Sequence, residues 1–147
     1  MPTPCNIQPL RQVDLGPAAK LWEASVRATH HFLTNDDVVT MRPEVAALLP
    51  RMPSLFGAFD AAGTLLGICG MQNRNIDLLF VHPHAFRCGI GRMLLLHAMQ
   101  FYEAQTVDVN EDNPGAIAFY LSVGFHVVSR SETDGAGRPF PILHLSL

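Results

Sequence analysis

Two glycines separated by one residue predict a phosphate site near the middle of the chain. An apolar run typical of a strand, residues 76–81, leads into the loop that contains Gly89-Ile90-Gly91, and an apolar segment typical of a helix follows at once. Glycine lets the backbone approach a ligand closely, because it has no Cβ and can adopt positive φ. The first amides of a helix lack internal partners and, with the helix dipole, attract anions. We therefore expect this loop to bind a small molecule that carries a phosphate.

A second motif, residues 110–125, comes one predicted helix and one predicted strand later. It opens with Asn110, and Asn113 followed by Pro114 is typical of a helix start. That helix carries a Phe-Tyr pair ending in Tyr120 and stops at a glycine four residues on. In this order and at this spacing, the two motifs resemble the acetyl-CoA site of the GCN5-related N-acetyltransferases (GNAT).

The resemblance covers roughly residues 55–130 and implies the GNAT fold: one mixed α/β domain over residues 1–147, with about seven strands and four helices. It implies acetyl-CoA as co-substrate and direct attack by a bound primary amine through a tetrahedral intermediate. The residues that it assigns to coenzyme A belong to the two motifs and the preceding strand: Phe80, Val81, Phe86, Arg87, Cys88, Gly89, Ile90, Gly91, Arg92, Asn110, Asn113 and Tyr120.

One position departs from the family pattern. The family usually has Gln or Arg three residues before the first glycine of the loop, and here that position is Phe86, with Arg87 one place later. Most contacts in the loop are expected to come from backbone N–H groups. We therefore expect a weakened or reorganised phosphate contact at Phe86, with coenzyme A still bound.

The transfer reaction needs a proton donor for the leaving thiolate, because the C–S bond breaks as the intermediate collapses. The resemblance assigns this catalytic role to the hydroxyl of Tyr120. The alternative is a tyrosine that only fills the core beside Phe119. A hydroxyl donor at the sulfur favours an enzyme over a non-catalytic acyl-CoA-binding sensor, which has no use for one.

The attacking amine must also lose a proton, and Asp77 is the first candidate base. A carboxylate among apolar strand residues is partly desolvated, which raises its pKa. The two-residue period of a strand predicts that Asp77 shares a face with Leu79 and Val81. The alternative is a strand-end aspartate that pairs with Arg74 or with solvent.

The loop after the first predicted helix offers other candidates. His30 and His31 form the other candidate pair for the base, because imidazole titrates near neutral pH, and His30 continues the apolar stripe of that helix. In GNAT enzymes this loop lines the acceptor site, so the resemblance assigns His30, His31 and Phe32 to substrate binding. The alternative is a core histidine followed by one that the helix dipole favours. The remaining histidines lack metal-ligand spacing, so we expect no metal site: His82, His84, His97, His126 and His144.

The rest of the chain reads as elements that position these residues. We expect a short strand at residues 7–10 and a helix from Asp14. A second helix begins near Asn35, where Pro43 predicts a break or a new turn before Pro50. Residues 55–59 and 64–71 predict a hairpin, and residues 125–131 and 140–147 a closing one.

Composition and net charge limit the classes of partner that the protein is expected to bind. The chain has 147 residues and a net charge of −3, so it offers no basic field for nucleic acid or an anionic membrane. No apolar run approaches the roughly 20 residues that span a bilayer. Three scattered cysteines and no visible secretion signal favour a cytoplasmic protein. The expected partner is an amine acceptor, of a small molecule, peptide or protein; a homodimer is the default oligomer.

Overall fold

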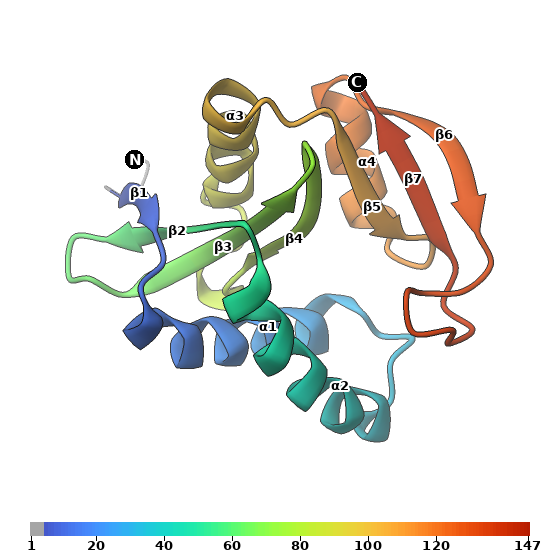
Figure 1. Ribbon diagram of the computed structural model, residues 1–147, viewed down its shortest axis with the longest axis horizontal. Helices are drawn as coiled ribbons and strands as arrows, with labels where there is room; N and C mark the ends of the chain where they lie inside the picture. The colour runs from blue at the N-terminus through green and yellow to red at the C-terminus, as the bar shows by residue number, and fades with distance from the viewer. Residues whose placement is uncertain (1–4) are drawn as a thin grey trace.

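Seven strands form one sheet in the computed structural model, which describes residues 5–147. Their order across the sheet is β1-β2-β3-β4-β5-β7-β6 (Figure 1). The strands are β1 (Cys5–Pro9), β2 (Ser54–Asp60), β3 (Leu65–Gln72), β4 (Asn75–Val81), β5 (Thr106–Asn110), β6 (His126–Ser131) and β7 (Ile142–Ser146). All neighbours are antiparallel except β4 and β5, which are parallel. The sheet therefore consists of two antiparallel parts joined at one parallel pair.

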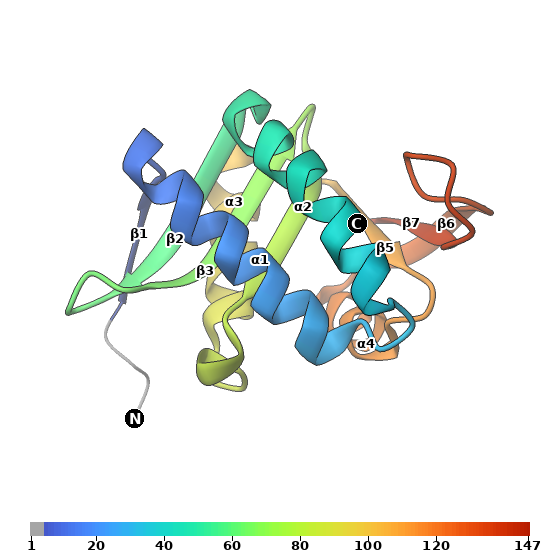
Figure 2. The ribbon, with the colours of Figure 1, turned by 90° about the horizontal axis from the view of Figure 1, so that it is seen from below.

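Helices cover both faces of this sheet (Figures 1 and 2). They are α1 (Leu15–Thr29) and α2 (Asn35–Leu48) on one face, with α3 (Ile90–Tyr102) and α4 (Pro114–Val123) on the other. Trp22 and Ile68 belong to the core under α1 and α2, whereas Phe56 and Leu94 belong to the core under α3 and α4. The predicted mixed fold of about seven strands and four helices is confirmed.

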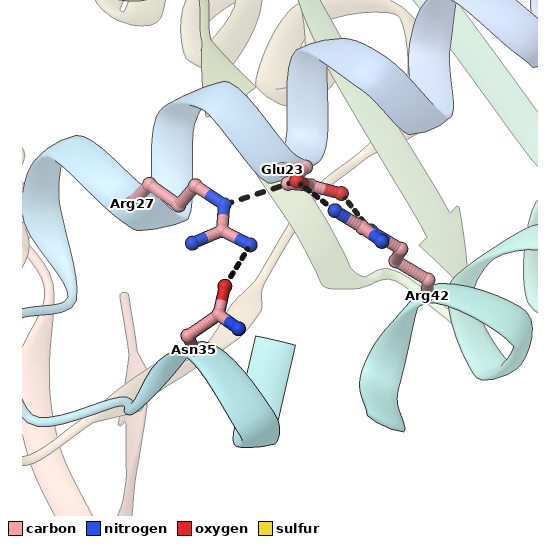
Figure 3. A network of polar contacts seen from close by, with 4 residues as sticks. All are labelled: Glu23, Arg27, Asn35 and Arg42. Carbon is pink, nitrogen blue, oxygen red and sulfur yellow. Dashed lines mark hydrogen bonds and ion pairs between the residues drawn. The ribbon is translucent and has the colours of Figure 1, made fainter. Parts of the chain in front are cut away.

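A charged network fixes α2 against α1 (Figure 3). Glu23 of α1 accepts hydrogen bonds from Arg42 of α2, with Nη2 at 2.7 Å, and from Nε of Arg27 at 3.0 Å. Arg27 also donates to Oδ1 of Asn35 at 2.9 Å. The hydrogen bonds from Arg42, with those from Arg27, lower the pKa of Glu23 to about 2, so its charge persists at neutral pH. The network holds in place both ends of the loop between the two helices.

The second helix corrects one expectation. Thr34 caps it through a reciprocal pair of hydrogen bonds with Asp37, and the helix then runs unbroken past Pro43 to Leu48. Pro43 removes the N–H that would bond to the carbonyl of Val39. Val39 is 43% exposed, so water can satisfy that carbonyl. The predicted break at Pro43 was therefore wrong, because the helical hydrogen bond that this proline removes lies on the exposed side of α2.

A β-bulge interrupts β4 at Asp77. Adjacent residues of β3 pair with Ile76 and Leu78, and Asp77 between them has no register partner on β3. Strict alternation would put Ile76 and Leu78 on one face. Instead Ile76 belongs to the core under α3, and Leu78 belongs to the core under α1 and α2.

The bulge overturns the predicted placement of Asp77. Leu79 and Val81 pack against the core under α3. The Asp77 carboxylate accepts a hydrogen bond from the amide of Asn75, whose neighbour Ile76 faces α3. Asp77 therefore lies on the face of Asn75 and not on that of Leu79 and Val81, because the extra residue shifts the alternation.

The close fit of α3 on β3 yields a prediction about stability. A Cβ on Gly67 would lie 2.8 Å from Cδ1 of Leu94 and 2.9 Å from Cγ2 of Ile90. Both side chains are fully buried and cannot swing away. We predict that Gly67→Ala lowers the free energy of unfolding by about 1–3 kcal/mol, as overpacked cores do. Urea denaturation measures this; Gly135→Ala, which meets nothing within 4 Å, is the control. Equal midpoints for the two variants would contradict the account.

Candidate active site

The site begins where β4 and β5 separate. The two strands pair only at Asn75↔Thr106 and Ile76↔Val107, and then diverge (Figure 1). The rest of β4 keeps its pairing with β3 on the other side, as far as Val81↔Gly67. A cavity of about 810 Å³ lies in this fork, lined by both strands, the start of α3, the inner face of α4 and the end of α1. It therefore reaches both faces of the sheet.

The glycine loop closes one end of the cavity with backbone amides. Arg87 and Gly89 adopt left-handed conformations, with φ of +64° and +81°, which turn the chain sharply into α3. The first helical hydrogen bond runs from Met93 N to Gly89 O at 3.0 Å. The amides of residues 90–92 precede it and have no place in the helical ladder. This end of the cavity can therefore accept an anion, as the sequence predicts.

Most of the predicted site residues line this one cavity. These are His30, Asp77, Phe80, Val81, Phe86, Arg87, Gly89, Ile90, Gly91, Arg92, Asn110, Asn113 and Tyr120. Cys88, His31 and Phe32 do not line it. Cys88 and His31 are exposed to solvent, whereas Phe32 is half-buried.

Tyr120 is packed in the core and yet reaches the cavity. Its ring makes edge contacts with Phe119 and Phe125, at centroid distances of 5.1 and 5.7 Å. Within residues 5–147 no side-chain oxygen is buried without a hydrogen-bond partner, and none of the hydrogen bonds there involves the Tyr120 hydroxyl. The hydroxyl therefore opens on the cavity. Burial, with the neighbouring Cys69, raises the pKa of this phenol, so the group is a protonated donor at neutral pH.

Asp77 lines the same cavity at the fork. Burial raises the pKa of its carboxyl, and the charge of Asp108 raises it further, against the hydrogen bond from Asn75. Asp77 does not pair with Arg74, which was the alternative, because Arg74 Nη2 donates to Glu103 at 3.0 Å. Asp77 is thus a carboxylate with an elevated pKa and an open cavity in front of it, which suits a general base.

His30 is a weaker candidate for the base. The Thr29 hydroxyl donates to the carbonyl of Ser25 at 2.8 Å, so its oxygen is left to accept from Nδ1 of His30, also at 2.8 Å. Burial, aided by the charge of His31, lowers the pKa of His30 to about 4. The imidazole is therefore neutral, and its weak basicity suits a wall of the cavity better than a proton acceptor.

Phe32 supports this wall from behind. Its ring lies 5.4 Å from that of His30 and 5.6 Å from that of Phe140, in the loop between β6 and β7. Arg138 of the same loop pairs with Glu44 of α2. These contacts join the loop after α1, and α2 itself, to the loop between β6 and β7.

Sequence reasoning missed two polar residues at the fork. Asn75 stands beside Asp77, and Asp108 lines the cavity from β5. The alternation of polar and apolar residues in β5 was a signal that Asp108 shares a face with Asn110. Nothing in the sequence indicated that this face would meet Asp77.

Two features are absent from the part of the chain that the structure describes. Over residues 5–147, no three His, Cys, Asp or Glu side chains converge in a way that could hold a metal ion. In the same part of the chain, no helix has both the length and the apolar character needed to cross a membrane.

Comparisons with known proteins agree with this geometry. The model of the acetyltransferase (GNAT) domain matches residues 47–142. Peptidyl-lysine N-acetyltransferase YjaB of Escherichia coli K12 is 37% identical over 126 residues, 86% of this chain and 85% of the relative. The protein of the same name from Salmonella typhimurium is 36% identical over 140 residues, 95% of this chain and 96% of the relative.

Solved structures show the same fold. Apo YjaB from E. coli has a TM-score of 0.89 at 34% identity, over 97% of both chains. PaiA N-acetyltransferase of Thermoplasma acidophilum, in complex with coenzyme A, has a TM-score of 0.75 at 22% identity, over 98% of this chain and 99% of that one. On the family match and the identity to both YjaB proteins, the chain belongs to the GNAT family of acetyl-CoA-dependent N-acetyltransferases.

Proposed function

We propose that this enzyme acetylates the ε-amine of lysine in a peptide or protein. The observation that carries the proposal is the cavity in the β4–β5 fork, which places loop amides, the Tyr120 hydroxyl and the Asp77 carboxylate on one continuous surface. This chain matches more than four-fifths of the length of two relatives, and both are named peptidyl-lysine N-acetyltransferases. Their substrate class supports lysine over a small amine.

Coenzyme A would enter from the α3 side. The amides of residues 90–92 would bind its pyrophosphate, and Arg87 and Arg92 would add positive charge. The backbone of Phe80 and Val81 would bind the pantetheine arm at the free edge of β4. Phe86 lines the cavity but offers no polar side-chain group, so the amides would carry that part of the contact. Cys88 is exposed outside the cavity, and we propose no side-chain role for it.

The acceptor would enter from the α1 side. Its ammonium loses two protons in the transfer, one to each of two side chains. Asp77 takes one proton from the lysine ammonium, and the freed lone pair attacks the thioester carbonyl. As the C–S bond breaks, Tyr120 donates its proton to the sulfur of coenzyme A and is reprotonated as the nitrogen loses its second proton. The products are an amide, free CoA thiol and one proton released to solvent.

The proton donor yields a prediction with a close control. Tyr120→Phe keeps the ring in its aromatic packing but removes the hydroxyl, so we predict a fall in kcat of about 10²- to 10⁴-fold, the usual worth of general acid catalysis. The Kd for acetyl-CoA, measured by calorimetry, stays unchanged. Tyr102→Phe is the control, because Tyr102 stacks on Phe56 away from the cavity. Equal kcat for the two variants would remove Tyr120 from the chemistry and revive the sensor alternative.

The base yields a prediction about pH. Asp77 acts as a carboxylate, and burial and Asp108 raise its pKa. Because the base works only when it has lost its proton, kcat/KM rises with pH through a pKa above that of an ordinary aspartate. We predict that Asp77→Asn removes this acid limb and lowers kcat/KM across the range. Asp60→Asn, in the distant β2–β3 turn, keeps the wild-type profile. A limb that persists in Asp77→Asn would point to a different base.

A further inference from the structure

The β4–β5 fork ends in two carboxylates. Asn75↔Thr106 and Ile76↔Val107 are the only paired positions of the two strands. Asp77 on β4 and Asp108 on β5 are the first residues beyond that pairing, one on each arm. Both line the cavity. An acceptor that enters the fork therefore meets a negative charge from each side.

Asn75 ties the two arms together. Its Oδ1 accepts from the hydroxyl of Thr106 at 2.6 Å. Its Nδ2 donates to Asp77 Oδ1 and lies 3.4 Å from Asp108 Oδ2. Since ionised carboxylates only accept, the amide must turn its NH₂ toward them. One neutral amide thus serves two negative charges, and the pair keeps acceptor capacity for a further donor.

His144 holds Asp108 from the opposite side. Its Nδ1 lies 2.6 Å from Asp108 Oδ1, and its Nε2 lies 2.7 Å from the hydroxyl of Ser131. The ionised carboxylate can only accept, so Nδ1 carries the hydrogen; in the neutral imidazole, Nε2 then accepts from the Ser131 hydroxyl. Neither His144 nor Ser131 lines the cavity. The pair therefore fixes the Asp108 carboxylate from outside the cavity, with Oδ2 turned toward Asn75.

Among the described residues, no arginine or lysine pairs with either carboxylate. Across residues 5–147, the only ion pair of Asp108 is with His144, and Asp77 has none. Arg74, the nearest basic residue in sequence, is engaged by Glu103. The Asp108 side chain is 43% exposed, so a substrate can reach it. Two carboxylates that line one cavity, with no arginine or lysine of the described residues on either of them, form a site for a cation.

We propose that Asp77 and Asp108 together bind the ammonium of the acceptor lysine, and that His144 is the positioning residue for Asp108. This inference rests on the function proposed above and adds a substrate-binding residue to it. An ammonium has three N–H donors, and the two arms of the fork can accept one each. After Asp77 takes a proton, Asp108 keeps hold of the amine while its lone pair attacks. The site thus selects acceptors that arrive as cations.

The first test uses the wild type and two peptides. One carries lysine, and the other has the same sequence with an aminooxy group, uncharged at neutral pH, in place of the ammonium. With acetyl-CoA saturating, we expect KM for the lysine peptide to be lower by about 10- to 100-fold, the worth of hydrogen bonds to a charged group. Equal KM values would overturn the inference but leave lysine acetylation standing. No turnover of any lysine peptide would overturn the proposed function and this inference with it.

The second test removes one arm of the fork. Asp108→Asn keeps the shape of the side chain, so we expect KM for the lysine peptide to rise by about 10- to 100-fold. The KM values for acetyl-CoA and for the aminooxy peptide stay as in the wild type. Asp60→Asn, which removes one charge far from the cavity, changes none of them. Equal losses with both peptides, or a loss in kcat alone, would make Asp108 a residue of the fold and not of the substrate site.

A third pair of variants tests His144. His144→Gln keeps a donor for Asp108, whereas His144→Phe does not. We expect KM for the lysine peptide to rise in His144→Phe and to stay near the wild-type value in His144→Gln, with KM for acetyl-CoA constant in both. Unchanged KM in His144→Phe would show that Asp108 needs no such support and overturn the role given to His144.

Discussion

The early separation of β4 and β5 is the constraint on which the site depends. Parallel strands that kept their pairing would be joined by evenly spaced backbone hydrogen bonds and leave no space between them. Here the pairing stops after two positions, so the edge of β4 is free and a cavity opens through the sheet. The bulge at Asp77 falls at the same point and turns its carboxylate away from the face that Leu79 and Val81 share. The fork and the bulge together set where the reacting atoms can meet.

A cavity that passes through the sheet gives the two proposed substrates separate approaches to the fork. The glycine loop and Tyr120 lie on the face covered by α3 and α4, whereas His30 comes from the end of α1 on the opposite face. Glu23 and its arginines hold the loop after α1, and the Phe32–Phe140 contact links that loop to the loop between β6 and β7. A thioester and an amine can then approach the fork from opposite directions.

Local chemistry made much of this predictable. The glycine loop, the Asn113 cap and the strand and helix types are encoded by neighbouring residues, and the structure has them where the sequence places them. Long-range register is not encoded that way. In the sequence, the last two strands look like a simple closing hairpin, yet β7 inserts between β5 and β6 and sets His144 against Asp108. The bulge at Asp77 likewise arises from the register between β3 and β4, which a local sequence pattern does not encode.

The central claim is that acetyl-CoA lies in the fork, along the free edge of β4 and against the amides at the start of α3. Hydrogen–deuterium exchange of the wild type, with and without acetyl-CoA, tests it directly. We predict slower exchange on binding in residues 77–81 and 89–92, because amides there that lack a partner in the free protein gain one, and little change in the β2–β3 turn. Protection confined to other segments, with these two unaffected, would contradict the account.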